Sequence, residues 1–233
     1  MLFYLAVNET MIAENLKDVT QRISRSCEKS GRPADGVKLV CVTKEALPGQ
    51  VEEVLASGVK DIGENRVQDA LAKYMTIDGR ANWHLIGHLQ TNKVNHAVRI
   101  FSLIHSVDSL RLVEAIDREA KKIGKVQDLL IQINTSGENS KFGISPDAAG
   151  PFFEKAASYP NVAVRGLMTM APEVKDPEEA RPCFRKLREL RDELHSYQPS
   201  TINYQLSMGM SNDFEVAIEE GSTMIRVGRA IFK

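Results

Sequence analysis

Apolar positions along the chain follow two alternating periods. Short apolar runs rich in β-branched residues, which are typical of strands buried in a parallel sheet, alternate with stretches whose apolar residues recur every three or four positions. The pattern predicts eight strands, at residues 37–43, 59–62, 83–86, 103–107, 126–134, 162–167, 203–206 and 223–227. It predicts helices between them at residues 49–56, 64–75, 91–98, 109–123, 146–158, 177–196 and 212–220, after a leading helix at residues 9–29.

This alternation of strands and helices favours one fold class. Parallel neighbours need a crossover between them, and right-handed crossovers repeated eight times close the sheet into a (β/α)8 TIM barrel. An open doubly wound sheet is the alternative, but no GxGxxG motif follows the first predicted strand. No linker or low-complexity segment interrupts the pattern, so we expect a single domain over residues 1–233 with an extra N-terminal helix.

Composition narrows the class of protein. Hydrophobic residues make up 42% and charged residues 26% of the 233 positions, as in ordinary globular proteins, and a net charge of −1 provides no attraction for nucleic acid. The three cysteines are odd in number and far apart, which excludes a disulfide framework. No apolar stretch has membrane-spanning length. We expect a cytoplasmic protein that binds neither nucleic acid nor membrane and, without a long apolar seam, is a monomer.

A lysine stands at the end of the first predicted strand. The stretch KLVCVTKEALPG changes there from a buried run to Lys44, and a buried ammonium is costly unless it is paired, exposed or neutral. The simplest interpretation is that Lys44 marks where the strand reaches water. Because barrel chemistry sits at the carboxyl ends of the strands, Lys44 is also a candidate nucleophile. A partly desolvated strand end would favour its neutral amine, whose ordinary pKa is about 10.4.

Glycine-containing turns follow the last two predicted strands. Residues 207–211 read SMGMS and residues 227–229 read VGR. Turns of this kind that lead into helix N-termini present backbone N–H groups to an anion, and these two loops form the usual phosphate site of (β/α)8 barrels. A lysine across the mouth from a phosphate site has two interpretations. One is a Schiff-base aldolase that acts on a sugar phosphate, and the other is pyridoxal phosphate (PLP) held on Lys44.

Seven segments carry a family resemblance. In chain order they are VTKEALP, GENRVQ, WHLIGHLQTNK, SGENSKFG, GLMTMAP, LSMGMSNDFEVAIEEGST and IRVGRAIF, spread over nearly the whole chain. With these segments the chain resembles the YggS/PROSC family of pyridoxal phosphate homeostasis proteins. The resemblance implies a barrel similar to the N-terminal domain of alanine racemase, with Lys44 as the lysine that holds PLP as a Schiff base.

The same resemblance implies roles for five further residues. Asn65 would lie beside the cofactor ring, Ser207 with Gly228 and residue 229 would hold the phosphate, and Arg226 would face the pyridine nitrogen. One position departs from the family, because Arg229 stands where threonine is usual. The backbone N–H remains there, and a guanidinium is able to bind phosphate bidentately. Asn65 is equally suited to cap the helix that follows it.

Other conspicuous residues receive simpler interpretations. His84 and His88 have a metal-binding spacing only on a helix, whereas the pattern places His84 in a strand and His88 beyond it, so no metal site is expected. His105 and Trp83 are interpreted as packing or mouth-lining residues. The charged run at residues 173–195 is interpreted as a solvated helix face.

For function, the resemblance implies a carrier or buffer of PLP without a dedicated turnover, with PLP-dependent apoenzymes as candidate partners. The alternative is a PLP-dependent amino-acid racemase. A two-base racemase needs an acid/base on each face of the substrate carbanion, and Lys44 serves only one face. In alanine racemases the opposing tyrosine lies on a separate domain, for which we expect no room because the chain ends six residues after the last predicted strand.

Overall fold

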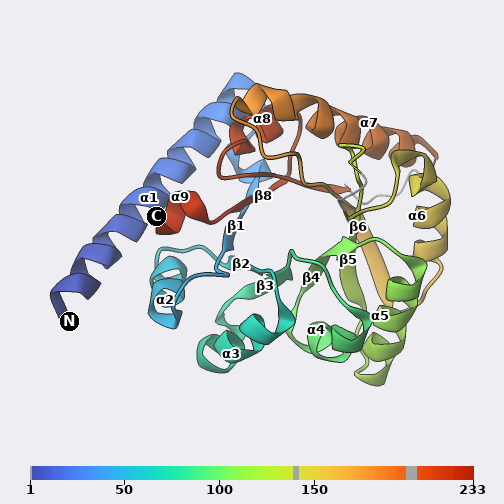
Figure 1. Ribbon diagram of the computed structural model, residues 1–233, viewed down its shortest axis with the longest axis horizontal. Helices are drawn as coiled ribbons and strands as arrows, with labels where there is room; N and C mark the ends of the chain where they lie inside the picture. Colours follow the sequence, from blue (N-terminus) through green and yellow to red (C-terminus); the bar gives the residue numbers. More distant parts are fainter. Residues whose placement is uncertain (1, 139–141, 198–203) are drawn as a thin grey trace.

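The computed structural model describes residues 2–138, 142–197 and 204–233, and in them eight parallel strands close into a barrel in sequential order (Figure 1). The strands are β1 (Lys38–Val42), β2 (Asp61–Glu64), β3 (Asn82–Leu85), β4 (Leu103–Val107), β5 (Gln127–Gln132), β6 (Val162–Met168), β7 (Gln205–Met210) and β8 (Met224–Val227). Strand β8 pairs with β1, with Val40 opposite Arg226 and Cys41 opposite Val227, and this pairing closes the ring. The prediction of a closed (β/α)8 barrel is confirmed.

Helices surround the barrel, as Figure 1 shows. The α-helices are α1 (Leu2–Lys29), α2 (Pro48–Ala56), α3 (Val67–Ile77), α4 (Val94–Ile100), α5 (Leu110–Lys122), α6 (Ala149–Ala157), α7 (Arg181–Tyr197), α8 (Phe214–Glu219) and α9 (Arg229–Phe232). Short 3-10 helices are η1 (Ala34–Gly36), η2 (Asp78–Arg80), η3 (Thr91–Lys93), η4 (Pro146–Ala148) and η5 (Pro177–Ala180). Over the described ranges, none of these helices combines the length and the apolarity that crossing a membrane requires.

The leading helix α1 covers the place where the barrel closes. Its apolar stripe, which the sequence pattern identified, is buried together with residues of α8, α9, β1 and β8. The members of this cluster include Ile12, Leu16, Val19, Ile23, Cys41, Phe214, Ile225, Val227 and Ile231. Helix α1 therefore stabilises the pairing of the first strand with the last.

Two strands lie further along the chain than predicted. Strand β2 starts at Asp61 instead of residue 59 and includes Gly63, which pairs with Val42 and His84 rather than forming a turn. Strand β7 starts at Gln205 and continues to Met210, whereas the predicted strand ended at residue 206; residue 203 lies outside the described residues. The predicted strand ended early because Gly209 resembles part of a turn. Gly209 instead lies within an irregular part of β7, where its φ is 93° and a Cβ would be 2.6 Å from the Ala217 Cβ.

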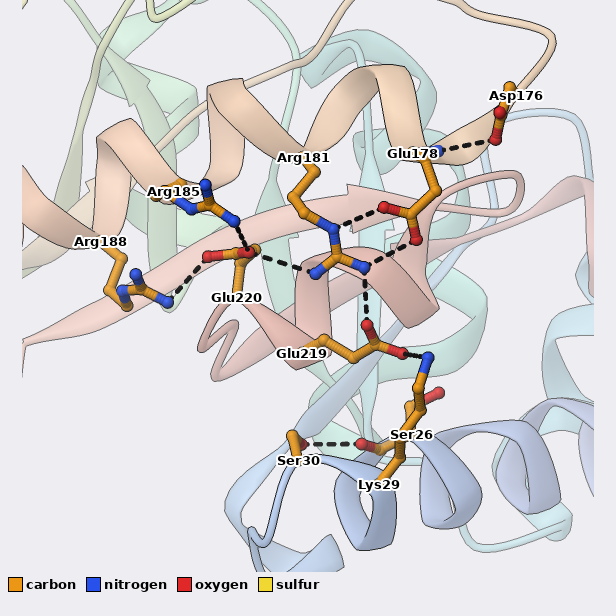
Figure 2. A network of polar contacts seen from close by, with 10 residues as sticks. All are labelled: Ser26, Lys29, Ser30, Asp176, Glu178, Arg181, Arg185, Arg188, Glu219 and Glu220. Carbon is orange, nitrogen blue, oxygen red and sulfur yellow. Dashed lines mark hydrogen bonds and ion pairs between the residues drawn. The ribbon is translucent and has the colours of Figure 1, made fainter.

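An ion-pair network fixes α8, which follows the loop after β7 (Figure 2). Glu220, with a side chain only 5% exposed, accepts hydrogen bonds from three arginines of α7: Arg181 at 3.1 Å, Arg185 at 3.0 Å and Arg188 at 2.7 Å. Glu219 joins Arg181 at 2.7 Å to Lys29 of α1 at 2.6 Å. The network therefore ties the end of α8 to α7 and α1 and limits movement of the loop that precedes α8.

Replacing Glu220 with alanine is expected to lower the free energy of unfolding by about 2 kcal/mol, because three arginines lose a shared buried acceptor. Urea unfolding of the purified variant measures this. Glu173→Ala is the matched control, since Glu173 pairs with Arg229 at 3.3 Å at an exposed site and its loss is expected to leave stability unchanged. Equal effects of the two substitutions would contradict the assignment.

The effect of Glu220→Ala is also expected to depend on pH. Burial alone would raise the pKa of Glu220, but hydrogen bonds from Arg185 and Arg181 and the charge of Arg188 outweigh it and hold the pKa below the usual value. The contribution of a carboxyl with a lowered pKa is complete above the unfolded pKa of about 4.3 and is lost as the pH falls through the folded pKa. The difference between wild type and variant should therefore shrink on acidification.

Candidate functional site

Lys44 lies in the turn after β1, at the carboxyl mouth of the barrel where the sequence placed it. Its side chain is 46% exposed, and Nζ lies 3.6 Å from Glu45 Oε1. We expected a partly desolvated amine that favours the neutral form. In the structure nearly half of the side chain is exposed and the amine lies beside a carboxylate, so water has access to it.

A buried polar cluster lies directly behind Lys44. Lys73 of α3 donates a hydrogen bond to the carbonyl oxygen of Thr43 at 2.5 Å and to Glu64 Oε1 at 2.7 Å. The Thr43 hydroxyl donates to the same carboxylate oxygen at 2.6 Å. All three residues are buried, and Thr43 immediately precedes Lys44. The sequence pattern gave no signal for this contact, because Glu64 was expected at the start of the helix at residues 64–75 rather than at the end of a strand.

Asn65 follows β2 directly and is half-buried. Because β2 is the neighbour of β1 in the barrel, Asn65 and Lys44 leave the sheet at the same mouth from adjacent strands. Helix α3 begins at Val67, two residues after Asn65, rather than at residue 64 as predicted. The position agrees with the place that the family resemblance gave Asn65, and its contact with a cofactor ring stays a prediction.

Arg226 of β8 lies inside the barrel and is only 4% exposed. Its Nη1 donates to Ser207 Oγ at 2.5 Å, and its Nη2 donates to the carbonyl oxygen of Thr169 at 2.8 Å. Burial lowers the pKa of this guanidinium to about 10, with the charge of Asp213 acting in the opposite direction. Arg226 therefore stays protonated at neutral pH and offers hydrogen-bond donors only.

Ser207 lies within β7 rather than in the turn that follows this strand. The residue belongs to β7, is fully buried, and its hydroxyl is engaged by Arg226 and by His105 Nδ1 at 2.9 Å. Because β7 continues past residue 206, Ser207 points into the barrel, and its contact with a phosphate stays a prediction. Ser211, in the turn after β7, lies at the position that was expected of Ser207. Its Oγ accepts a hydrogen bond from the backbone N–H of Ala230 at 3.3 Å, which joins this turn to the start of α9.

Gly228 and Arg229 follow β8 beside Lys44. A Cβ at Gly228 would lie 2.9 Å from the carbonyl oxygen of Val42, so a side chain there would crowd β1. The guanidinium of Arg229 is directed to Glu173, with both Nη atoms 3.3 Å from Oε1. A contact between this guanidinium and a phosphate would therefore compete with Glu173. The donor that this turn provides is the backbone N–H of residue 229.

Strand order brings these groups together. Strands β8, β1 and β2 are consecutive neighbours, so the Gly228 turn, Lys44 and Asn65 follow one another around the mouth, with Arg226 one layer below. The turn with Ser211 adjoins them through α9. One mouth therefore combines a primary amine, a carboxamide, a buried cation and two loops with hydroxyl and backbone N–H groups. This combination suits a phosphorylated carbonyl compound.

Comparison with known proteins identifies relatives over almost the whole chain. A family model described as alanine racemase, N-terminal domain, matches residues 12–233. A curated pyridoxal phosphate homeostasis protein of Aquifex aeolicus is 46% identical over 220 residues, which are 94% of this chain and 96% of the relative. PipY of Synechococcus elongatus, solved with PLP bound, superposes with a TM-score of 0.82 at 35% identity and covers 95% of this chain and 100% of PipY.

A more distant neighbour shares only the fold. Alanine racemase of Clostridium difficile superposes with a TM-score of 0.73 at 15% identity, covering 95% of this chain and 56% of the racemase. The identities of the nearer relatives are far higher, and these relatives cover almost the whole chain. The chain therefore belongs to the alanine racemase N-terminal domain family and, within it, to the YggS/PROSC family of pyridoxal phosphate homeostasis proteins.

Proposed function

We propose that this protein binds PLP at the carboxyl mouth of the barrel, holds it as a Schiff base on Lys44, and serves as a carrier or buffer of the cofactor without a dedicated turnover. The observation that carries the proposal is the placement of Lys44 in the turn after β1, beside the Gly228 turn and above Arg226 of β8. PipY, a relative of similar length, is solved with PLP bound, which supports the same ligand here.

The residues present fit the chemical groups of PLP. The phosphate requires donors near a turn without a bulky side chain, and Ser211 with the backbone at Gly228 and Arg229 provides them. The pyridine nitrogen has a lone pair, and the buried guanidinium of Arg226 can only donate. Asn65 remains the candidate for the ring edge. PLP itself would supply an aldehyde and an electron-accepting ring.

The exposure of Lys44 favours carriage over retention. Lys44 would hold PLP through its amine, and formation of a Schiff base with the aldehyde would release one water molecule. The reverse reaction requires water at the same bond. Since 46% of the Lys44 side chain is exposed, water has direct access to the amine at this position. Such reversibility suits a protein that stores and releases its ligand.

The alternative racemase activity needs a second acid/base at the mouth. Tyr74 packs on Trp83, Tyr204 packs on Phe153, and Tyr159 packs against the apolar core, so these three tyrosines are engaged elsewhere. His88 follows β3, with Nδ1 3.8 Å from Asp108 Oδ2, and is the imidazole that a racemase would use. The cation at Arg226 cannot accept a proton from the pyridine nitrogen, so the ring would be a weak electron sink. Since alanine racemases also use an arginine at this place, Arg226 does not separate the two functions by itself, and the placement of the tyrosines weighs more in favour of the carrier.

The proposal extends to the setting of the protein. A single domain that acts as a monomer in the cytoplasm and passes PLP to PLP-dependent apoenzymes is the arrangement we infer. The large apolar side chains that are most exposed come from five separate segments, at Met11, Leu47, Met75, Val126 and Phe142. Scattered apolar residues of this kind do not form the continuous patch that a stable interface needs.

The first test is the visible absorption band of the protein mixed with PLP. We expect a Schiff-base band that borohydride abolishes, with the reduced adduct located by mass spectrometry on the peptide that contains residue 44. Lys44→Ala should lose both. Lys233→Ala is the matched control, because Lys233 is exposed and pairs with the same Glu45, at 3.5 Å, and it should keep both.

Racemisation assays on several amino acids accompany this test. We expect no turnover above that of free PLP. A turnover that disappears in both Lys44→Ala and His88→Gln would establish the racemase and overturn the carrier. An adduct on a lysine other than Lys44 would overturn the site.

The buried pair of Glu64 and Lys73 is expected to hold the end of β1 that carries Lys44. Lys73→Met leaves the Glu64 carboxylate buried without a cation, and the expected loss in the free energy of unfolding is about 3 kcal/mol. In the double variant Glu64→Gln/Lys73→Met the buried side chain is neutral, and most of that loss should be recovered. Urea unfolding compares the two variants. A double variant no more stable than Lys73→Met would show that the buried charge is not the cause.

A further inference from the structure

A continuous chain of polar side chains passes through the barrel interior. Asp61 Oδ1 lies 2.9 Å from His84 Nε2, and His84 Nδ1 lies 2.9 Å from His105 Nε2. His105 Nδ1 lies 2.9 Å from Ser207 Oγ, which accepts a hydrogen bond from Arg226 at 2.5 Å. These five residues, from β2, β3, β4, β7 and β8, are called the polar column below.

The polar column joins the two ends of the barrel. Asp61 is the first residue of β2 and lines a cavity of about 460 Å³ at the amino-terminal end, together with Lys38 and Asn82. Arg226 lies near the end of β8, below the candidate site. Between these ends the two imidazoles are at most 2% exposed. A buried apolar cluster inside the barrel consists of Val40, Leu103, Leu130, Met168 and Met224.

The ionisation of Asp61 is set by its neighbours. Burial opposes its charge, but the hydrogen bond from His84 and the charge and hydrogen bond of Lys38 outweigh burial and hold the pKa of Asp61 below the usual value. Lys38 Nζ lies 3.1 Å from the same oxygen, and the amide of Asn82 donates to it at 3.3 Å. Asp61 is therefore a carboxylate near neutral pH and accepts every hydrogen bond it makes.

The carboxylate of Asp61 determines the direction of each hydrogen bond in the polar column. Burial lowers the pKa of His84 and, to well below the usual value, that of His105, so both imidazoles are neutral and each carries one N–H. His84 donates through Nε2 to Asp61, so its Nδ1 must accept from His105 Nε2–H. His105 Nδ1 is then an acceptor, and Ser207 must donate to it.

The other end of the column imposes the same direction. The guanidinium of Arg226 can only donate hydrogen bonds, so Ser207 Oγ must accept one from it. The single hydroxyl proton of Ser207 is then donated to His105. All four bonds therefore run one way, from the cation of Arg226 to the anion of Asp61. A chain of aligned hydrogen bonds is mutually polarised, and no member can reverse without leaving a buried group unsatisfied.

We propose that Asp61, His84, His105 and Ser207 are positioning residues that hold Arg226 in one orientation for the ring nitrogen of the cofactor. The proposal rests on the proposed binding of PLP at the carboxyl mouth. It makes Asp61, at the opposite end of the barrel, a determinant of how the cofactor is held. A purely apolar interior would fill the same volume but would leave the Arg226 guanidinium without its Ser207 acceptor.

The first test concerns the protein without cofactor. Nitrogen-15 NMR of histidine-labelled protein near neutral pH should show both His84 and His105 as neutral imidazoles protonated at Nε2, with signals assigned from His84→Gln and His105→Gln. An Nδ1–H tautomer or an imidazolium at either position would overturn the polar column. A column that only fills space would not fix both tautomers.

The second test measures PLP affinity by absorbance titration. Ser207→Ala removes the acceptor of Arg226, and Asp61→Asn removes the anion at the far end while preserving the shape of the side chain. Each is expected to weaken binding by about tenfold, the effect of losing one charge-assisted hydrogen bond, and to alter the spectrum of bound PLP. Asp128→Asn is the matched control, since Asp128 lines the same cavity and pairs with Arg165 at 2.8 Å outside the column.

The outcomes separate the two proposals. Wild-type affinity and spectrum in both Asp61→Asn and Ser207→Ala would overturn the positioning role, and so would an equal loss in Asp128→Asn. A wild-type protein that takes up no PLP would overturn the proposed function instead. In that case the NMR signals of the Arg226 guanidinium test whether the polar column restrains this side chain. We expect restricted rotation of the guanidinium in wild type and faster rotation in Ser207→Ala.

Discussion

The hydrogen-bonded pairing of β8 with β1 is the constraint on which the rest of the structure depends. It closes the barrel, and its register sets Val40 against Arg226 and Cys41 against Val227. That register places the turn with Lys44 beside the turn with Gly228, although more than 180 residues separate them in the chain. Helix α1 buries its apolar stripe over this pair of strands, so an element outside the barrel core secures the geometry of the mouth.

Charged groups on both sides of the barrel wall support this geometry. Outside the wall, the ion pair of Glu64 and Lys73 holds the carbonyl oxygen of Thr43. Inside the wall, the polar column gives the buried cation of Arg226 an acceptor. Buried charges are costly unless every partner is present, so each arrangement specifies one geometry more strongly than apolar packing would. The amine that would form the covalent bond is, by contrast, exposed to water.

The sequence predicted the architecture because strand and helix periods are local signals. The fourth strand was predicted at residues 103–107 and is observed there, and Lys44 was placed at the correct mouth. Residues whose roles depend on register were not predicted. His84 and His105 are 21 residues apart, and His105 and Ser207 are 102 apart, so no local pattern joins them. Gly209 resembled a turn, which ended the predicted seventh strand too early, so Ser207 was expected in a loop and lies within β7.

A crystal structure of the protein soaked with PLP tests the central claim most directly. The account predicts density that is continuous from Lys44 Nζ to the cofactor, with the phosphate between Ser211 and the Gly228 turn and the ring nitrogen facing Arg226. Cofactor bound at the amino-terminal cavity near Asp61, or held at the carboxyl mouth without a bond to Lys44, would contradict it.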